Sequence, residues 1–362
     1  MMCCRTSQLI ALCCAVTFAL NSHAADGMQK GTPQLKQAGP LAFAPDGVLL
    51  IGDTQSASIF AIDTQDHGGG NAGSEINVSG INQKIAAMIG SATNDTLIND
   101  MVVNPSSGNV YLSVSRGRGP DAVPLIFKVD SKGALSELAL ENVNFAQASL
   151  DNAPKGDPAR GGRDPRLSSI TDIQFNSGKV IVAGLSNEEF ASTLRVIDYP
   201  FDGRTQSTGI EIYHGAHGRL ETASPVRTFI TYENTVLAAY TCTPLVSIPV
   251  DDLKPQSRTK GRTIAELGNR NTPLDMIIYR KGDQDYLLMA NTARGVMKLK
   301  LNKAQIDSAE SISTRIDGTA GIGYETIESL KNVDQLDKLD DSRAVLLVSN
   351  ANQVDLKTIQ LP

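Results

Sequence analysis

The sequence contains no tryptophan, and only 5% of its 362 residues are aromatic. Because sugar-binding sites commonly stack their ligands on aromatic faces, this scarcity argues against a polysaccharide binder. Basic residues form no block, and 33 Lys and Arg are outnumbered by 39 Asp and Glu. A net charge of −6 without a basic cluster argues against nucleic acid as a partner.

Recognisable catalytic and nucleotide-binding motifs are also absent. The sequence has no G-x-S-x-G elbow, no H-E-x-x-H pair and no phosphate-binding loop. No nucleotide cofactor is therefore expected.

Cysteine is scarce beyond the N-terminus. Four of the five cysteines lie within the first 14 residues, and Cys242 is the fifth. We therefore expect no disulfide within the mature chain, which must be stabilised by an ordinary hydrophobic core.

The first 24 residues have the pattern of a signal peptide. Arg5 precedes an apolar run from Leu9 to Leu20, and small residues follow up to Ala24. This pattern predicts a signal peptide over 1–24, a mature chain from Ala25, and a periplasmic or secreted location. No later apolar run reaches the length of a membrane span, so no integral membrane segment is expected in the mature chain.

Six similar apolar runs recur along the chain, starting between 50 and 70 residues apart. They are VLLIGD from Val48, VYLSVS from Val110, VIVAGL from Val180, VLAAYT from Val236, YLLMAN from Tyr286 and VLLVSN from Val345. Each is rich in Val, Leu and Ile and ends at turn-forming or polar residues, which is typical of a buried strand. Repetition at this period indicates a repeat architecture.

Further strands surround each run. An apolar strand precedes it, often through turns such as Pro-Asp-Gly, and a third strand follows. Weaker alternating stretches supply a fourth strand in five units: SEINV from Ser74, ELAL from Glu137, IEIY from Ile210, RTIAEL from Arg262 and SISTRI from Ser311. The last unit lacks one, and we expect PQLKQ, from Pro33, to close the ring there.

These observations predict an all-β, six-bladed β-propeller that occupies 25–362 as one domain and is closed by an N-terminal strand. In a four-stranded meander, the start of the first strand, the loop between the second and third strands, and the loop leading to the next blade lie at one rim. The acidic, basic, histidine and cysteine residues considered below all fall in these three positions.

Aligned blades place acidic residues near the start of the innermost strands. Pro40, Asp100, Asp172, Arg227 and Asp275 fall at equivalent positions, with Asp334 as a weaker sixth. Carboxylates around a channel mouth suit a hard cation such as calcium, and Asn99 adds a neutral oxygen. The alternative is that these aspartates accept hydrogen bonds from backbone amides or pair with Arg227.

Two units carry a family resemblance. The segment AGPLAFAPDGVLLIGDTQSASIFAID at 38–63 resembles an NHL-type repeat, and NDMVVNPSSGNVYLSVS at 99–115 is similar to units of the gluconolactonase and paraoxonase-like six-bladed propellers. In those families inner-strand Asp and Asn residues coordinate a divalent cation, so the resemblance implies that role for Asn99, Asp100, Asp172 and Asp275. It departs from the gluconolactonase pattern at Ala38, where a ligating Glu is expected.

Two loops on the proposed face are basic. The segment 152–167 carries Lys155, Arg160, Arg163 and Arg166, and the loop after Val110–Ser115 carries Arg116 and Arg118. Such a rim would attract a small anionic ligand or an acidic protein partner. The alternative is a set of solvated loops with incidental charge.

The same face receives two histidines and the late cysteine. His214 and His217 form an H-x-x-H pair, which indicates a metal only if further ligands converge from other blades. Cys242 would be a nucleophile only with one of these histidines beside it. The alternatives are an ordinary surface loop and a small buried apolar side chain.

The sequence thus favours an exported propeller that binds a ligand or protein partner at one rim, through Arg116, Arg118, Arg160, Arg163, His214, His217 and Arg227, with a divalent cation in the channel. A metal-dependent lactonase or esterase and a scaffold of an envelope complex stay open as alternatives. The sequence does not decide between binding and catalysis.

Overall fold

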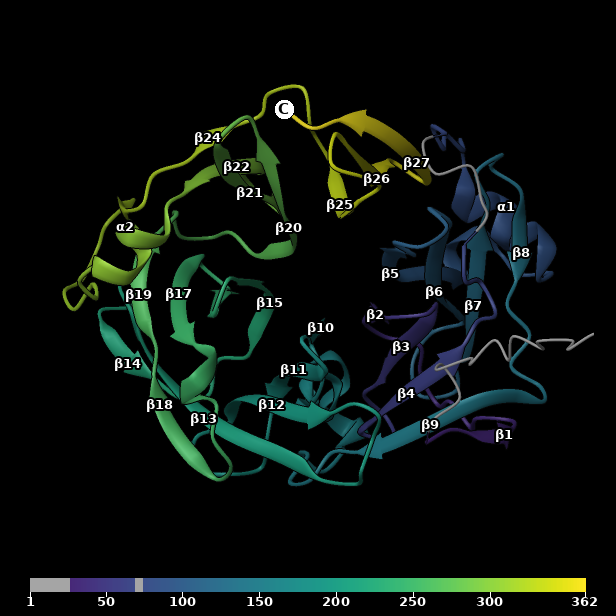
Figure 1. Cartoon of the computed structure of the whole chain (residues 1–362), viewed down its shortest axis with the longest axis horizontal. Helices are drawn as coiled ribbons and strands as arrows, with labels where there is room; N and C mark the ends of the chain where they lie inside the picture. The colour runs from purple at the N-terminus through teal and green to yellow at the C-terminus, as the bar shows by residue number, and fades with distance from the viewer. Residues whose placement is uncertain (1–26, 69–73) are drawn as a thin grey trace, which may run out of the picture.

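The computed structural model describes residues 27–68 and 74–362, so the predicted signal peptide at 1–24 lies outside the described residues. The described chain forms six sheets arranged around a central axis (Figure 1). This confirms the predicted six-bladed β-propeller. We number the blades one to six by the order in which their innermost strands occur in the sequence.

The innermost strands are β2 (Leu41–Ala44), β5 (Thr96–Val103), β10 (Asp172–Asn176), β15 (Val226–Tyr232), β20 (Pro273–Lys281) and β25 (Val333–Lys338). The second strands are β3 (Val48–Asp53), β6 (Val110–Arg116), β11 (Lys179–Leu185), β16 (Thr235–Tyr240), β21 (Gln284–Asn291) and β26 (Arg343–Asn350). The second strands coincide with the six apolar runs. They are the most buried part of each blade because both of their faces are covered by neighbouring blades.

The third strands also lie where the sequence predicts them. They are β4 (Ser58–Asp63), β7 (Val123–Val129), β12 (Ser192–Asp198), β17 (Pro244–Pro249), β22 (Gly295–Leu301) and β27 (Gln353–Gln360). Within each blade the first three strands pair in antiparallel order, as in a meander.

The outermost strands match the prediction in blades two, three and four, as β8 (Leu135–Glu137), β13 (Thr205–His214) and β19 (Arg262–Glu266). The prediction is wrong for blade five, where β24 (Glu325–Thr326) and not the stretch from Ser311 pairs with β22. It is also wrong for blade one. There the outer strand is β9 (Val143–Ser149), which enters the sheet only after the chain has built blade two.

The order of blades around the ring differs from their order in the sequence. The innermost strand of blade one contacts those of blades two and three, whereas that of blade two contacts blade six. Around the axis the blades therefore run two, one, three, four, five, six, as the positions of β5, β2 and β10 in Figure 1 show.

Six hydrophobic clusters fill the six junctions between neighbouring blades. Leu50 of blade one packs with Val180 of blade three, and Leu112 of blade two packs with Leu347 of blade six. The other clusters join blades one and two, three and four, four and five, and five and six. Each fully buried Leu or Ile contributes about 1.5–3 kcal/mol, so these clusters are the main force that holds the ring closed.

The predicted closure by Pro33–Gln37 is wrong, because that segment forms no strand. The N-terminal strand β1 (Gln29–Gly31) instead pairs with β9, outside blade one. Blade six is completed by the segment after blade one, where Val78 forms a bridge with Leu356 of β27. The predicted strand SEINV is therefore reduced to a single bridge at Val78, and it completes blade six and not blade one.

Few other elements occur in the described residues. They are the helices α1 (Ile81–Met88) and α2 (Lys303–Ser308) and short 3-10 turns at Thr93–Asp95, Pro158–Arg163, Pro165–Ser168 and Val250–Asp252. The short strands β14 (Arg219–Glu221) and β18 (Ser257–Lys260) pair with β13, and β23 (Ala320–Gly321) pairs with β19, at the outer edges of blades three and four. In the part of the chain that the structure describes, no helix is long and apolar enough to cross a membrane.

Candidate functional site

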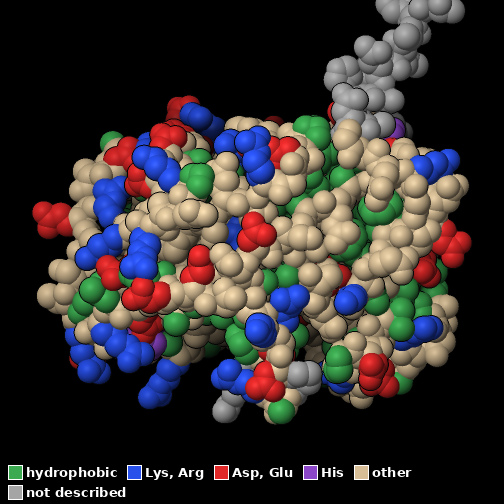
Figure 2. Space-filling model, turned by 90° about the horizontal axis from the view of Figure 1, so that it is seen from below, with side chains coloured by type: hydrophobic (Ala, Val, Ile, Leu, Met, Phe, Trp, Pro, Cys, Tyr) green, Lys and Arg blue, Asp and Glu red, His purple; other side chains and the backbone are tan. Residues whose placement is uncertain are grey.

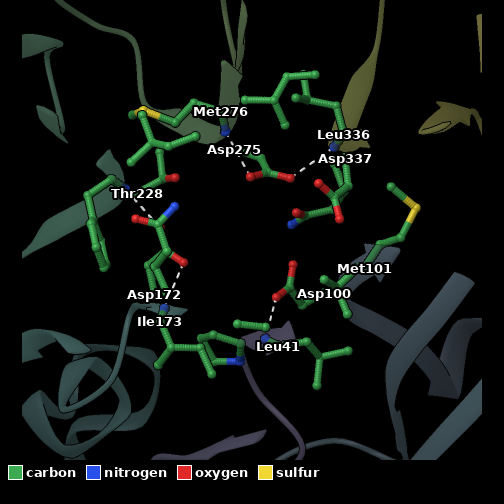
Figure 3. Close-up of a pocket in the computed structure, with 18 of the residues that line it drawn as sticks. Leu41, Asp100, Met101, Asp172, Ile173, Thr228, Asp275, Met276, Leu336 and Asp337 are labelled. Carbon is green, nitrogen blue, oxygen red and sulfur yellow. Dashed lines mark hydrogen bonds between the residues drawn. The ribbon is translucent and has the colours of Figure 1, made fainter. Parts of the chain in front are cut away.

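Four aspartates of the innermost strands project into the central channel (Figure 3). They are Asp100, Asp172, Asp275 and Asp337, from blades two, three, five and six. The channel holds a cavity of about 430 Å³. The structure thus brings together three aspartates that the sequence predicts, and it adds Asp337.

Each of these carboxylates accepts a backbone N–H from the innermost strand of the next blade. The bonds run from Leu41 N to Asp100 Oδ2 (2.6 Å), from Phe229 N to Asp172 Oδ2 (2.8 Å), from Leu336 N to Asp275 Oδ2 (2.9 Å) and from Val103 N to Asp337 Oδ2 (2.7 Å). All four point in the same sense around the ring. They are bonds between blades, and they fix the order of blades six, two and one.

The second oxygen of three carboxylates accepts the N–H of the following residue, as in Met276 N to Asp275 Oδ1 (2.7 Å). The Oδ1 of Asp100 faces Gln335, whose amide nitrogen donates to it (3.0 Å) and to Asp275 Oδ2 (2.9 Å) in the orientation that satisfies both. Gln335 therefore bridges two carboxylates across the channel.

Burial raises the pKa of all four carboxyls. The pKa of Asp172 rises to about 7 and that of Asp337 to about 6, chiefly because the charged form loses hydration. The pKa values of Asp100 and Asp275 are also raised by burial and, in addition, by the neighbouring carboxylates. At neutral pH the ring therefore favours added positive charge, either as protons or as a cation.

The residues fit a calcium site of the gluconolactonase type only in part. Asn99 donates its side-chain N–H₂ to Ala38 O (2.8 Å) and to Ser115 Oγ (2.8 Å), so its amide is engaged with neighbouring strands. Ala38 contributes no carboxylate. Among the described residues, the channel aspartates do not form a group whose ligand atoms all lie within 4.8 Å of one another.

A β-bulge explains why the sequence alignment misplaced two residues of the ring. The pairing between first and second strands shifts by one residue at Asn99, Arg227, Leu274 and Asp334. Thr228, and not Arg227, therefore lies in register with Asp172, and Gln335, and not Asp334, takes that position in blade six. Asp334 accepts a bond from Ser349, while Asp337, two residues beyond Gln335, enters the channel. Arg227 still lines the channel, and burial lowers its pKa. Bulges are invisible to alignment by hydrophobic pattern because each inserts one unpaired residue.

A second cavity, of about 700 Å³, lies beside the channel mouth between the two basic loops. Lys36, Arg118, Lys155 and Arg166 supply its positive charge, and Leu97 and Leu167 supply apolar surface. Asn99 lines both this cavity and the channel. We refer to this cavity as the rim pocket. In side view, Lys and Arg side chains lie along both edges of the propeller and are mixed with acidic side chains (Figure 2).

Only some of the basic residues predicted at the rim line the rim pocket. Arg118 lines the rim pocket, but Arg116 and Arg160 do not, and the side chain of Arg163 lies outside what the structure describes. Lys36 also lines the rim pocket but was not predicted from the sequence, because its position depends on the path of the N-terminal segment past blade one.

His214 and His217 do not line the rim pocket. They lie with Cys242 where the loop between β13 and β14 meets the loop between β16 and β17. Both histidines contact Glu221 through Nδ1. Although burial alone would raise the pKa of Glu221, hydrogen bonds from His214, Ser224, His217 and Arg219 lower it to about 2, so this carboxylate is ionised.

No protein-family model matches the chain, and no curated protein matches it in sequence. The NHL and gluconolactonase relationship therefore stays a resemblance. Among solved structures, Drosophila plexin A in complex with semaphorin 1b is 10% identical, with 92% of this chain and 86% of that chain covered and a TM-score of 0.38.

Two further structures are similarly remote. The PQQ-bound aldose sugar dehydrogenase of Streptomyces coelicolor is 12% identical over 91% of this chain and 96% of its own, with a TM-score of 0.34. The computationally designed Ika4 protein is 12% identical over 54% of this chain and 92% of its own, with a TM-score of 0.27. Likenesses this distant carry no argument about function, so the class of the protein, a six-bladed β-propeller, rests on its own strand pairing.

Proposed function

We propose that the protein binds a small anionic ligand with an apolar part in the rim pocket. The observation that carries the proposal is the combination of four cations and two leucines around one half-open cavity. A volume of about 700 Å³ falls within the range of small-molecule sites, about 300–1,000 Å³. A concave space of this size favours a small ligand over the alternative of an acidic protein partner.

The four cations of the pocket outnumber its acidic side chain, Asp164. Arg166 donates to the carbonyl oxygens of Gln55 (3.0 Å) and Pro154 (2.9 Å), and Arg118 donates to that of Asn94 (2.7 Å). Carbonyl oxygens orient a guanidinium without cancelling its charge. Among the ion pairs of the described residues, none involves these arginines, Lys36 or Lys155.

The one acidic side chain of the pocket is already engaged. Asp164 accepts the backbone N–H of Asp157 (2.8 Å) and of Arg166 (2.9 Å), which holds the 152–167 loop in shape. The chain as a whole carries a net charge of −6, so the net positive charge of this pocket is opposite in sign to that of the molecule. An anion would be concentrated in the pocket.

The test uses an anionic fluorescent probe with an apolar body, anilinonaphthalene sulfonate, and compares two double variants. Arg118→Gln with Lys155→Gln removes two charges that line the pocket. Arg116→Gln with Arg160→Gln removes the same charge from the same two loops without touching the lining. Because a hydrogen bond to a charged group contributes about 1.5–3 kcal/mol, we expect the first pair to weaken probe binding at least about 10-fold.

The control pair should change probe affinity less than about 2-fold at 0.1 M salt, where charges about 10 Å away are screened. If both double variants lose probe affinity equally, the probe responds to the overall positive charge of the two loops and not to the pocket, and the proposal is refuted. Competition by inorganic phosphate should displace the probe from the wild-type protein.

A calcium-dependent hydrolase is the second candidate, and the raised pKa values of the channel aspartates favour it, because a cation would relieve their repulsion. The engaged amide of Asn99 and the missing carboxylate at Ala38 disfavour it. Calcium should then raise the melting temperature, since a ligand that binds only the folded state stabilises it. If neither calcium nor a chelator shifts the melting temperature, this candidate is excluded.

A further inference from the structure

Three potential metal ligands from two blades meet at the rim. His214 ends β13 of blade three, His217 follows in the same loop, and Cys242 lies in the loop between β16 and β17 of blade four. One ligand atom from each lies within 4.8 Å of the other two. The two imidazole rings are 3.8 Å apart between centroids. An isolated H-x-x-H pair is weak evidence for a metal site, but here a third ligand, Cys242, joins the pair from another blade.

Glu221 orients both histidines in the same way. Its Oε2 lies 2.9 Å from His214 Nδ1, and its Oε1 lies 2.7 Å from His217 Nδ1. A carboxylate oxygen at these distances accepts the N–H of an imidazole, so each Nδ1 is the donor, and in the neutral ring this leaves a lone pair on Nε2. A carboxylate behind a histidine in this manner is the usual outer partner of a metal-bound imidazole.

The Nε2 atom of His214 accepts no hydrogen bond from the described residues. The His214 side chain is 2% exposed, so this atom is buried. A buried acceptor without a partner costs about 1–3 kcal/mol, so a bound group at this atom would remove a real penalty. His217 is 41% exposed, which gives an ion a path from solvent.

The backbone holds Cys242 in an unusual conformation. It has φ 65°, in the left-handed region that a side chain disfavours, and the turn is closed by Thr243 N donating to Tyr240 O (2.8 Å). Cys242 N donates to Asn271 O of the neighbouring segment (2.7 Å). Strain of this kind, kept by surrounding bonds, is concentrated at functional sites.

A second carboxylate, that of Glu266, holds the histidine loop through a hydrogen bond to its backbone. Glu266 is 1% exposed and accepts Gly215 N through Oε1 (2.5 Å). A side chain at position 215 would collide with Glu266, so glycine lets the loop close over it. The histidine loop is therefore anchored on both sides and not free at the surface.

We propose that His214 Nε2, His217 Nε2 and Cys242 Sγ bind one zinc-class transition-metal ion, with a fourth position open to water. Two imidazoles and one thiolate match the nitrogen and sulfur ligands of zinc, whereas calcium and magnesium take oxygen ligands. On binding, the thiol of Cys242 loses its proton to solvent and a metal–sulfur bond forms. The site is distinct from the channel and from the rim pocket, and it does not depend on the proposed function.

The test is titration of metal-free full-length protein with zinc, followed by calorimetry and by elemental analysis after dialysis. The wild type should bind one zinc at this site. Cys242→Ser and His217→Ala should each weaken zinc binding at least about 100-fold, because loss of a ligand should exceed the 10–100-fold cost of losing an outer partner. His67→Ala, a partly exposed histidine outside the site, is the matched control and should bind like the wild type.

Cobalt gives a second readout that does not depend on stability. A cobalt–thiolate bond produces near-ultraviolet charge-transfer absorption, which should appear in the wild type and in His67→Ala and be missing from Cys242→Ser. Glu221→Gln should keep this absorption but require about 10–100-fold more metal, because it removes orientation and not a ligand.

Alkylation of Cys242 by iodoacetamide, located by peptide mapping, separates the metal site from the other use of this geometry. Zinc should protect Cys242 from alkylation. Fast alkylation that zinc does not change would indicate a Cys–His–Glu nucleophile and overturn the proposal. Absence of zinc binding, or equal zinc binding by wild type and Cys242→Ser, would overturn it as well.

Discussion

The channel and the rim pocket are neighbours that share Asn99, yet they use charge in opposite ways. In the channel, aspartates accept backbone N–H groups from adjacent blades, so their oxygens are committed to the fold. In the rim pocket, the arginines donate to carbonyl oxygens and none of the four cations forms an ion pair with the described residues, so they outweigh the one carboxylate, that of Asp164. The comparison shows that a ring of conspicuous acids can be structural, while a less regular set of basic loop residues is better placed to bind a ligand.

The largest effect should follow from breaking a bond between blades in the channel. Asp275→Ala removes the acceptor for Leu336 N and Met276 N and leaves two amides unsatisfied. We expect a loss of about 2–4 kcal/mol in the free energy of unfolding. Chemical denaturation would measure it, with Asp283→Ala, an exposed acid in the same blade, as the control. Equal stability of the two variants would contradict a structural role for the channel acids.

The next effect is a pH dependence that Asp100→Asn should reduce. The folded-state pKa values of about 7 for Asp172 and about 6 for Asp337 exceed the ordinary value of 3.8, so the folded state binds more protons than the unfolded state. Their contribution to stability is therefore fully present below about pH 4 and is lost as the pH rises through 6 and 7.

An asparagine at position 100 keeps an acceptor for Leu41 N and removes one charge from the ring. Melting temperatures of wild type and Asp100→Asn between pH 5 and 8 should thus diverge, with the variant more stable at pH 8. If the two melting temperatures change in parallel with pH, charge repulsion within the aspartate ring does not lower stability. A permanently bound cation would give the same result, because it would neutralise the ring. Repeating the series with a chelator distinguishes these two cases.

A smaller effect on stability is expected from Asp355 in blade six, and this contribution is lost as the pH is lowered and not as it is raised. Asp355 accepts Gly80 N (2.9 Å), and backbone and side-chain hydrogen bonds lower its pKa to about 2. Its contribution is present above about pH 4 and is lost as the pH falls toward 2. Asp355→Ala should cost about 1 kcal/mol at neutral pH, measured by denaturation, and little at pH 2. A loss that is the same at both pH values would contradict this assignment.

The smallest effect on stability should come from the rim pocket. The Arg118→Gln, Lys155→Gln variant should unfold within about 0.5 kcal/mol of the wild type, because exposed loop charges contribute little to folding. Its denaturation curve should therefore overlay that of the wild type while its probe affinity falls. A large destabilisation would show that these charges, like those of the channel, serve the fold.

Much of the candidate site could be predicted from the sequence, but its details could not. Asp100, Asp172 and Asp275 were placed in the channel because aligning the innermost strands of the blades puts them at equivalent positions. Asp337 was missed because it lies two residues further along its strand than the aligned position, which the bulge at Asp334 gives to Gln335. The pairing of Arg118 with the 152–167 loop followed from strand direction, whereas Lys36 entered the pocket through a chain path that no local pattern records.

The sequence by itself determined the number of blades, the position of every second and third strand, and the residues that form the core. These features depend on the period of apolar residues and on turn-forming residues, which are local. Only the tertiary structure decided that blade two lies between blades six and one, that β9 completes blade one, and that Val78 completes blade six. The period of a strand specifies which face is buried, but not which strand it pairs with, and the choice of partner depends on contacts between residues far apart in the chain.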